Sequence, residues 1–133
     1  MDYLPLFVEI RDRPCLLVGG GEIARRKLEL LLRAGAQVEI VAPALSPETR
    51  ALAEAHGLAV RERAFQDADA DGRYLIIAAT NDTAVNASVF EAGTRRATLV
   101  NSVDQPGISS AIFPALVDRS PVQIAIFTGG GSP

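Results

Sequence analysis

Three consecutive glycines, Gly19–Gly21, follow a short apolar run near the start of this 133-residue sequence. Gly19, Gly21 and Ala24 match the spacing G-x-G-x-x-[GA], which is typical of dinucleotide-binding sites when it lies between a strand and a helix. The first glycine allows a tight turn, the second lets a pyrophosphate approach the backbone, and the small third residue lets helix and strand pack closely. Free N–H groups at the helix N-terminus then attract the phosphates. The spacing predicts a dinucleotide site, with a ligand-free glycine turn as the alternative.

One part of the usual dinucleotide site is missing. Many dehydrogenases carry an acid after the second strand to bind the adenosine ribose, or an arginine that accommodates a 2′-phosphate. The corresponding stretch, Val41–Ala44, contains neither, and Glu39 lies inside the predicted strand. Two interpretations stay open: backbone groups around Pro43 and Ala44 hold the ribose, or this loop binds no ribose. NAD is favoured over NADP only because the arginine is absent.

Polar residues also follow two later predicted strands, as Thr80-Asn81-Asp82 and as 101–104. In an open α/β sheet, ligands bind at the carboxyl ends of the strands. We therefore predict that Thr80 and Asn81 contact the nicotinamide side of the ligand. Asp82 is interpreted as a helix cap.

Asp104 is the candidate for proton transfer. It lies three residues past a predicted buried strand and just before Gln-Pro-Gly. The single histidine, His56, is predicted at a helix end far from the glycine loop, and the single cysteine, Cys15, is predicted to be buried. Carboxylates are therefore the leading proton carriers. An Asx-turn that only shapes the backbone is the alternative.

Alternating strands and helices must position these residues. Apolar runs predict strands at 15–18, 38–41, 58–63, 74–79 and 98–101. Helical periodicity predicts helices over 23–33 and 47–55, and Ser46 is the predicted cap of the second. A third helix is predicted to be capped by Asn81 or Asp82. Its inner face is formed by Val85, Val89 and Ala92. Residues 65–73 are expected to form a loop or short helical turn. This order implies an α/β fold with a Rossmann-type, doubly wound, mainly parallel sheet.

The pattern changes after Asp104. Residues 112–117, interrupted by Pro114, and 122–128 predict two strands that form a hairpin at the edge of the sheet. The last residues, Gly129–Pro133, resemble the start of a further element, because Ser and Pro usually open a helix. We expect the natural polypeptide to continue beyond them.

Composition limits the function classes. Apolar residues make up 48% of the chain, which excludes a disordered chain, and the net charge of −3 gives no basic surplus for nucleic acid or an anionic membrane. One Cys and one His exclude structural zinc, iron–sulfur clusters and internal disulfides. Without a signal peptide or a spanning apolar run, a soluble cytoplasmic domain is expected. Arg25, Arg26 and Lys27 could attract an anionic substrate, but a solvated helix face explains them equally well.

Taken together, five segments resemble one family: DYLPLFVEIRDRPCLLVGGGEIARRK, IIAATND, VNSVDQP, FPALVDRSPVQIAI and TGGGSP. They are similar to the N-terminal module of siroheme synthase, the precorrin-2 dehydrogenase and sirohydrochlorin ferrochelatase, across essentially all 133 residues. The resemblance implies oxidation of precorrin-2 to sirohydrochlorin with NAD⁺. Several members then insert Fe²⁺ to give siroheme.

The resemblance also implies residue roles. Gly19, Gly20, Gly21, Glu22 and Ile23 would hold the pyrophosphate, and Pro43 and Ala44 the adenosine end, in a ribose site made mostly of backbone groups. Asp104 matches the aspartate thought to act as general acid/base in dehydrogenation, and possibly in chelation. Chelation would use no fixed His/Cys metal site, so no metal ligands are assigned.

Residues 1–111 are thus expected to form an NAD-binding domain, and residues 112–133 a hairpin and the start of a dimerisation region. Family members continue into helices that help form a homodimer. Two alternatives remain: a nucleotide-sensing regulatory domain, which would not need Asp104, and a Rossmann-like structural module that has lost its ligand. The missing acid after the second strand argues against the first, and the intact glycine spacing against the second.

Overall fold

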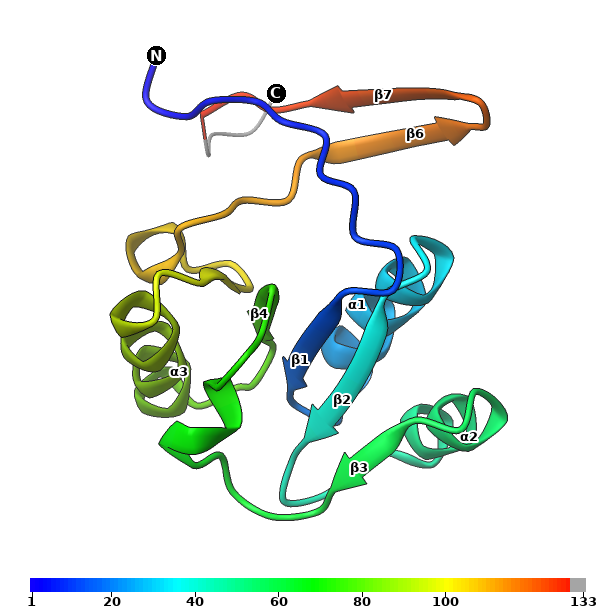
Figure 1. Ribbon diagram of the computed structural model, residues 1–133, viewed down its shortest axis with the longest axis vertical. Coiled ribbons are helices and arrows are strands. Elements are labelled where there is room, and N and C mark those ends of the chain that lie inside the picture. The colour runs from blue at the N-terminus through cyan, green and yellow to red at the C-terminus, as the bar shows by residue number, and fades with distance from the viewer. Residues whose placement is uncertain (130–133) are drawn as a thin grey trace.

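Five parallel strands form one sheet in the order β3-β2-β1-β4-β5 (Figure 1). The computed structural model describes residues 1–129. The strands are β1 (Pro14–Val18), β2 (Gln37–Val41), β3 (Ala59–Arg61), β4 (Leu75–Ala78) and β5 (Leu99–Ser102). The chain moves outward from β1 to β3, then returns to place β4 on the other side of β1. This reversal confirms the predicted doubly wound sheet and creates a switch point at the carboxyl ends of β1 and β4, where such sheets bind ligands.

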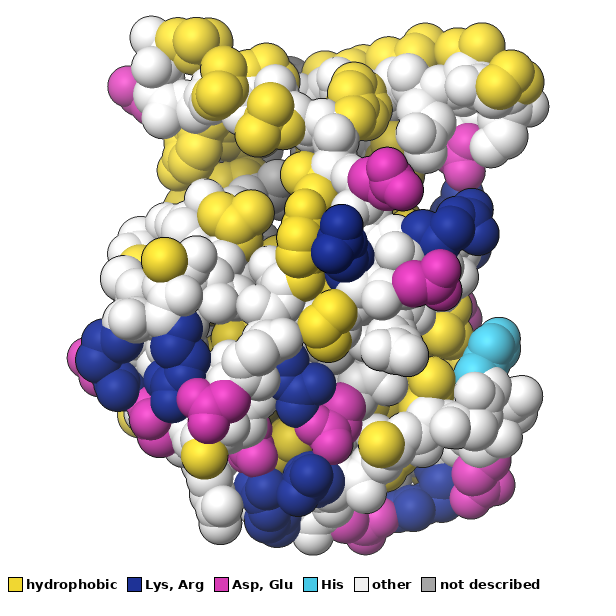
Figure 2. All heavy atoms as spheres, in the orientation of Figure 1, with side chains coloured by type: hydrophobic (Ala, Val, Ile, Leu, Met, Phe, Trp, Pro, Cys, Tyr) yellow, Lys and Arg dark blue, Asp and Glu magenta, His cyan; other side chains and the backbone are white. Residues whose placement is uncertain are grey.

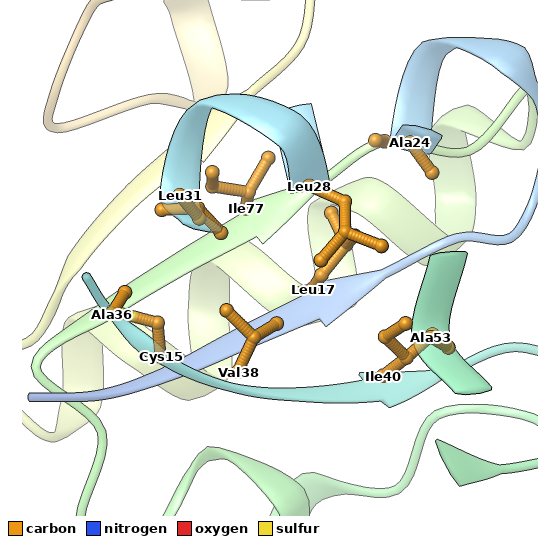
Figure 3. Close-up of a cluster of buried hydrophobic side chains, with 11 residues drawn as sticks. Cys15, Leu17, Ala24, Leu28, Leu31, Ala36, Val38, Ile40, Ala53 and Ile77 are labelled. Atoms are coloured by element: carbon orange, nitrogen blue, oxygen red, sulfur yellow. The ribbon is translucent and has the colours of Figure 1, made fainter. Parts of the chain in front are cut away.

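Helices cover both faces of the sheet (Figure 1). They are α1 (Glu22–Arg33), α2 (Pro47–Ala55) and α3 (Thr83–Arg95), with short 3₁₀ turns η1 (Asp67–Ala70) and η2 (Pro106–Ile108). Leu28 of α1 and Ala53 of α2 pack on one face with Leu17 and Ile77, as Figure 3 shows. The other face packs against α3. Because both faces are covered, the strands can be almost wholly apolar.

The predicted elements agree closely with the observed ones. Helix α2 has the predicted bounds, and Ser46 Oγ caps it by accepting a hydrogen bond from Thr49 N at 3.2 Å. Asp82, one of the two candidates, caps α3. The third strand is shorter than predicted, and 65–73 contains the 3₁₀ turn η1. On α3, Val89 and Ala92 are buried as predicted, but Asn86 is buried as well.

The C-terminal hairpin exists, but its predicted place at the edge of the main sheet is corrected. Strands β6 (Ala115–Arg119) and β7 (Val122–Ile126) pair antiparallel as a separate sheet. The edge of β5 is already occupied by the segment that follows η2. Ser110 Oγ accepts a hydrogen bond from Val100 N at 2.8 Å, and Ser109 Oγ accepts one from Ser102 N at 2.8 Å.

The hairpin and the N-terminal segment lie together, away from the main sheet (Figures 1 and 2). Tyr3 and Phe127 meet edge to face at 5.2 Å, and Arg33 at the end of α1 forms an ion pair with Asp118 at 2.7 Å. Figure 2 shows apolar side chains gathered over this part. Within residues 1–129, no helix is long and apolar enough to cross a membrane. Residues 130–133, the end of the predicted dimerisation region, lie outside the described residues.

Candidate functional site

Gly19 lies where three strands end. Its N–H donates to Val41 O at 3.0 Å, while Ala79 N donates to Val18 O at 2.8 Å. Gly19 has φ +135°, and a Cβ on it would lie 2.3 Å from Ala79 O. Only glycine fits this conformation and this close approach, because a side chain would collide with backbone. The first glycine of the motif is therefore required by the fold itself.

Gly20 is the contact between the glycine loop and the loop after β2. Its carbonyl accepts a hydrogen bond from Ser46 N at 2.8 Å, and a Cβ on it would lie 2.2 Å from Ala44 O. Thr49 Oγ1 donates to Gly21 O at 3.3 Å. The structure thus brings Ala44, the residue after Pro43, beside the glycine loop, and the N-terminal turn of α2 holds the two loops together.

Gly21 differs from the other two glycines. A Cβ on it would meet no protein atom within 4 Å, and its φ of −92° is open to any residue. It is the N-cap of α1, yet no side chain caps this helix end. Packing within the protein therefore does not require a glycine at this position. A ligand that approaches the helix N-terminus closely would require one. The open space at Gly21 and the helix end without a side-chain cap are compatible with a dinucleotide pyrophosphate.

The loop after β4 presents Thr80 and Asn81 at the same sheet edge. The Thr80 hydroxyl is occupied: it lies 2.6 Å from Asn86 Oδ1 and accepts a hydrogen bond from Asp82 N at 3.1 Å. Asn81 is exposed, and its side chain has no hydrogen bond within the described residues. Of the two predicted contacts, the side chain of Asn81 is free to meet a ligand, whereas Thr80 shapes the loop.

Asp104 is exposed just beyond β5, with φ +60°. An aspartate tolerates this left-handed conformation better than most residues. Its carboxylate makes no hydrogen bond or ion pair within residues 1–129, so the Asx-turn alternative is not supported. Gln105 N donates to Ser102 O at 3.0 Å and closes the turn that carries Asp104.

Lys27 and Asn101 lie near Asp104; the sequence showed Lys27 on a helix face and Asn101 in the polar stretch 101–104, and predicted no specific role for either. Lys27 of α1 lies with Nζ 4.2 Å from the centre of the Phe113 ring. Burial lowers the pKa of Lys27, and the charge of Asp104 acts in the opposite direction. Asn101 of β5 is buried, and its Oδ1 has no hydrogen-bond partner, although Nδ2 donates to Ala111 O at 2.9 Å. The tertiary structure brings Lys27 to the site, whereas Asn101 is only three residues from Asp104 in the sequence.

The other reactive side chains lie elsewhere. His56 ends α2, with Nδ1 3.1 Å from Leu52 O. Cys15 is buried in β1, where burial raises the pKa of its thiol to about 11. Among the described residues, no three His, Cys, Asp or Glu side chains are grouped closely enough to hold a metal ion.

Comparison with known proteins identifies the family to which this chain belongs and relatives that are similar over its whole length. The family model described as "Putative NAD(P)-binding" matches residues 6–115. Siroheme synthases of Thioalkalivibrio sulfidiphilus and Methylococcus capsulatus are 49% and 51% identical to this chain over all 133 residues. The chain spans only 27% and 28% of those two proteins.

A solved structure is similar over nearly the whole chain. It is entitled "SirC, precorrin-2 dehydrogenase" and superposes with a TM-score of 0.85 at 33% sequence identity. The match covers 98% of this chain and 64% of that one. The likeness extends beyond residues 6–115 of the family match into the hairpin. The glycine loop, the switch point of the sheet and the sequence matches all indicate an NAD(P)-binding fold. The chain belongs to this NAD(P)-binding family.

Proposed function

We propose that this chain oxidises precorrin-2 to sirohydrochlorin with NAD⁺. The observation that carries the proposal is the position of Asp104, a carboxylate without an internal partner, at the sheet edge that also carries the open glycine loop. The likeness to the precorrin-2 dehydrogenase structure and to siroheme synthases supports the choice of substrate.

The oxidation removes one hydride and one proton from the macrocycle. Bound NAD⁺ supplies the hydride acceptor. Asp104 accepts the proton at its carboxylate, and its exposed position lets a large substrate reach it. The backbone of Gly19, Gly20, Gly21, Glu22 and Ile23 holds the pyrophosphate.

The remaining cofactor contacts follow from the neighbouring loops. Ala44 lies against Gly20, and Ala44 and the preceding Pro43 hold the adenosine end through backbone groups, so no acid is needed after β2. Asn81 contacts the nicotinamide end with its side chain, and Thr80 does so with its backbone.

Insertion of Fe²⁺ into sirohydrochlorin, giving siroheme, is the proposed second reaction. Fe²⁺ is a substrate here, and two pyrrole N–H protons must leave as it enters. Asp104 is the carboxylate placed to take them one at a time. The naming of the relatives as siroheme synthases supports this second step.

We propose that residues 112–133 help to form a homodimer in the full-length protein. All of β7 is exposed, including Val122, Ile124 and Ile126. An isolated two-stranded hairpin is only marginally stable in water, so a partner surface is expected to cover it. A second copy offers the same apolar strip, and Ile124→Asp should then shift the protein from dimer to monomer in sedimentation.

No observation favours the nucleotide-sensing alternative. We propose the cytoplasm as the location, because NAD⁺ is available there.

The deciding experiment is anaerobic NADH formation from precorrin-2 and NAD⁺, compared with Asp104→Asn. Loss of a general base costs about 10²–10⁴-fold in rate, so kcat should fall in that range while NAD⁺ affinity is unchanged. Equal turnover would remove Asp104 from the mechanism. Absence of turnover in both proteins, with NAD⁺ still bound, would contradict the dehydrogenase assignment.

A further inference from the structure

Lys27 is the single lysine of the chain, and it lies on α1 over the ring of Phe113. Arg25 and Glu29 of the same helix line the hollow shared with α2. Ile23 and Lys27 are one turn apart on a different flank, since residues i and i+4 share a face. That flank meets Phe113, in the segment that leaves β5 for the hairpin.

The ammonium group of Lys27 has no counter-ion in the described structure. Its neighbours Arg25 and Arg26 both form ion pairs with Glu22. The helical positions three and four residues from Lys27, in contrast, are Ile23, Ala24, Leu30 and Leu31. None of them offers a carboxylate.

The surroundings make this lack of a partner costly. Lys27 is half-buried, and burial disfavours the charged form of an amine. The Phe113 ring compensates in part through a cation–π contact. Asp104 is near enough to act on the charge but forms no ion pair with it. A half-buried ammonium group without a counter-ion is electrostatically suited to a ligand anion.

We propose that Lys27 binds a carboxylate group of the substrate and holds it over Phe113, next to Asp104. This inference rests on the proposed function, because the reduced tetrapyrroles considered there carry several carboxylate side chains. Lys27 anchors one of these side chains, and the macrocycle carbon that is oxidised lies toward Asp104. Arg25 and Arg26 do not share this role, because their charges are already paired with Glu22.

The test compares Lys27→Met, which keeps the aliphatic stem, with Lys27→Arg, which keeps the charge. A hydrogen bond to a charged group contributes about 1.5–3 kcal/mol, which corresponds to roughly tenfold to 150-fold in affinity. Lys27→Met should therefore raise KM for precorrin-2 at least about tenfold, and Lys27→Arg should recover most of the loss. Arg26→Met is the matched control: it removes one charge from the exposed side of the same helix and should leave KM unchanged.

NAD⁺ affinity separates substrate binding from cofactor binding. If Lys27 serves the substrate, the Kd of NAD⁺ stays within about twofold in Lys27→Met. A rise in that Kd that accounts for the loss of activity would overturn the proposal. Equal KM values in Lys27→Met and the unsubstituted chain would also overturn it, and would make Lys27 a lysine that only extends its charged end toward solvent.

A binding measurement keeps the inference testable if turnover fails. The single lysine gives one set of side-chain NMR signals, which can be followed while sirohydrochlorin, the product, is added without NAD⁺. A bound carboxylate should raise the pKa of Lys27, and Lys27→Met should weaken sirohydrochlorin binding at least about tenfold. If the chain binds sirohydrochlorin but this lysine signal does not titrate differently, Lys27 is not the anchor, whatever the enzyme's activity.

Discussion

Asn86 Nδ2 donates a hydrogen bond to Gln105 Oε1 at 2.7 Å and another to Thr80 O at 3.1 Å. One buried side chain of α3 thus joins the loop after β4 to the loop after β5. The first loop carries Asn81 and the second carries Asp104. Asn86 is 2% exposed, and both ends of its amide are used, so the two loops cannot shift independently without breaking a buried hydrogen bond.

We predict that Asn86→Ala costs about 1–3 kcal/mol of unfolding free energy, because the buried groups around it lose their partners. Urea unfolding measures this loss. Gln105→Ala removes only the link between the loops and should lower kcat more than it lowers stability. The Gln105→Glu variant keeps an acceptor for Asn86 and should restore part of the rate; equal rates in Gln105→Ala and the unsubstituted chain would show that Asp104 is positioned without this link.

Gly20 and Gly21 should respond differently to the same substitution. Gly20→Ala places a methyl group against Ala44 O and should destabilise the fold by about 1–3 kcal/mol. Gly21→Ala meets open space, and although alanine is a poorer N-cap than glycine, it should lower the melting temperature by much less than Gly20→Ala. It should nevertheless raise the Kd of NAD⁺ at least roughly tenfold, which corresponds to ~1.4 kcal/mol of binding free energy. The reason is that the added methyl group would lie where the pyrophosphate is proposed to approach.

Calorimetry measures the NAD⁺ affinity of both variants, and thermal unfolding measures their stability. Normal NAD⁺ affinity in Gly21→Ala would show that the pyrophosphate does not lie over this glycine. Ala24 provides no such contrast, because it is fully buried against the strand.

Stability should fall in acid partly through Asp69. The Arg63 guanidinium forms two hydrogen bonds with its carboxylate, at 2.8 and 2.7 Å, and holds the pKa of Asp69 below its usual value. A carboxyl with a lowered folded-state pKa contributes stability above its unfolded pKa and loses it as pH falls through the folded one. Asp69→Asn should therefore be less stable at pH 7.

The same variant should lose less stability than the unsubstituted chain between about pH 5 and pH 2. Urea midpoints across this range measure the difference. Glu54→Gln, which changes an exposed carboxyl without an ion pair in the described structure, is the matched control. Parallel curves for Asp69→Asn and the unsubstituted chain would mean that this ion pair does not contribute to acid unfolding.

The Cys15 thiol should be inert in the folded protein. Burial in β1 raises its pKa to about 11, so almost no thiolate is present at pH 8. Reaction with a thiol reagent should be slow under native conditions and immediate in urea. Fast native labelling would indicate that β1 opens locally, although it lies at the centre of the sheet.

Local patterns were sufficient to predict the sheet and the glycine loop. Strand periodicity, helix caps such as Ser46, and glycine spacing depend on residues within a few positions of one another. The loops that carry Pro43, Asn81 and Asp104 could also be assigned to one edge, because parallel strands place their carboxyl ends together.

The contacts between loops could not be predicted in this way. Asn86 and Gln105 are 19 residues apart, and an asparagine inside a helix gives no signal of a distant partner. Lys27 and Phe113 meet only because the chain crosses back over α1 after β5. The hairpin was misplaced for a related reason: two serine hydroxyl groups, which a strand pattern does not reveal, already pair with β5.

Ser109 and Ser110 have a consequence for how this protein behaves at high concentration. An exposed edge strand invites strand addition by another molecule, which is a common route to aggregation. The hydroxyl groups fill the β5 hydrogen-bonding positions at Val100 and Ser102, and the opposite edge strand, β3, has only three residues. Intermolecular strand addition is therefore disfavoured at both edges of the main sheet, so the exposed apolar hairpin is not accompanied by an open sheet edge that could act as a template for fibrils.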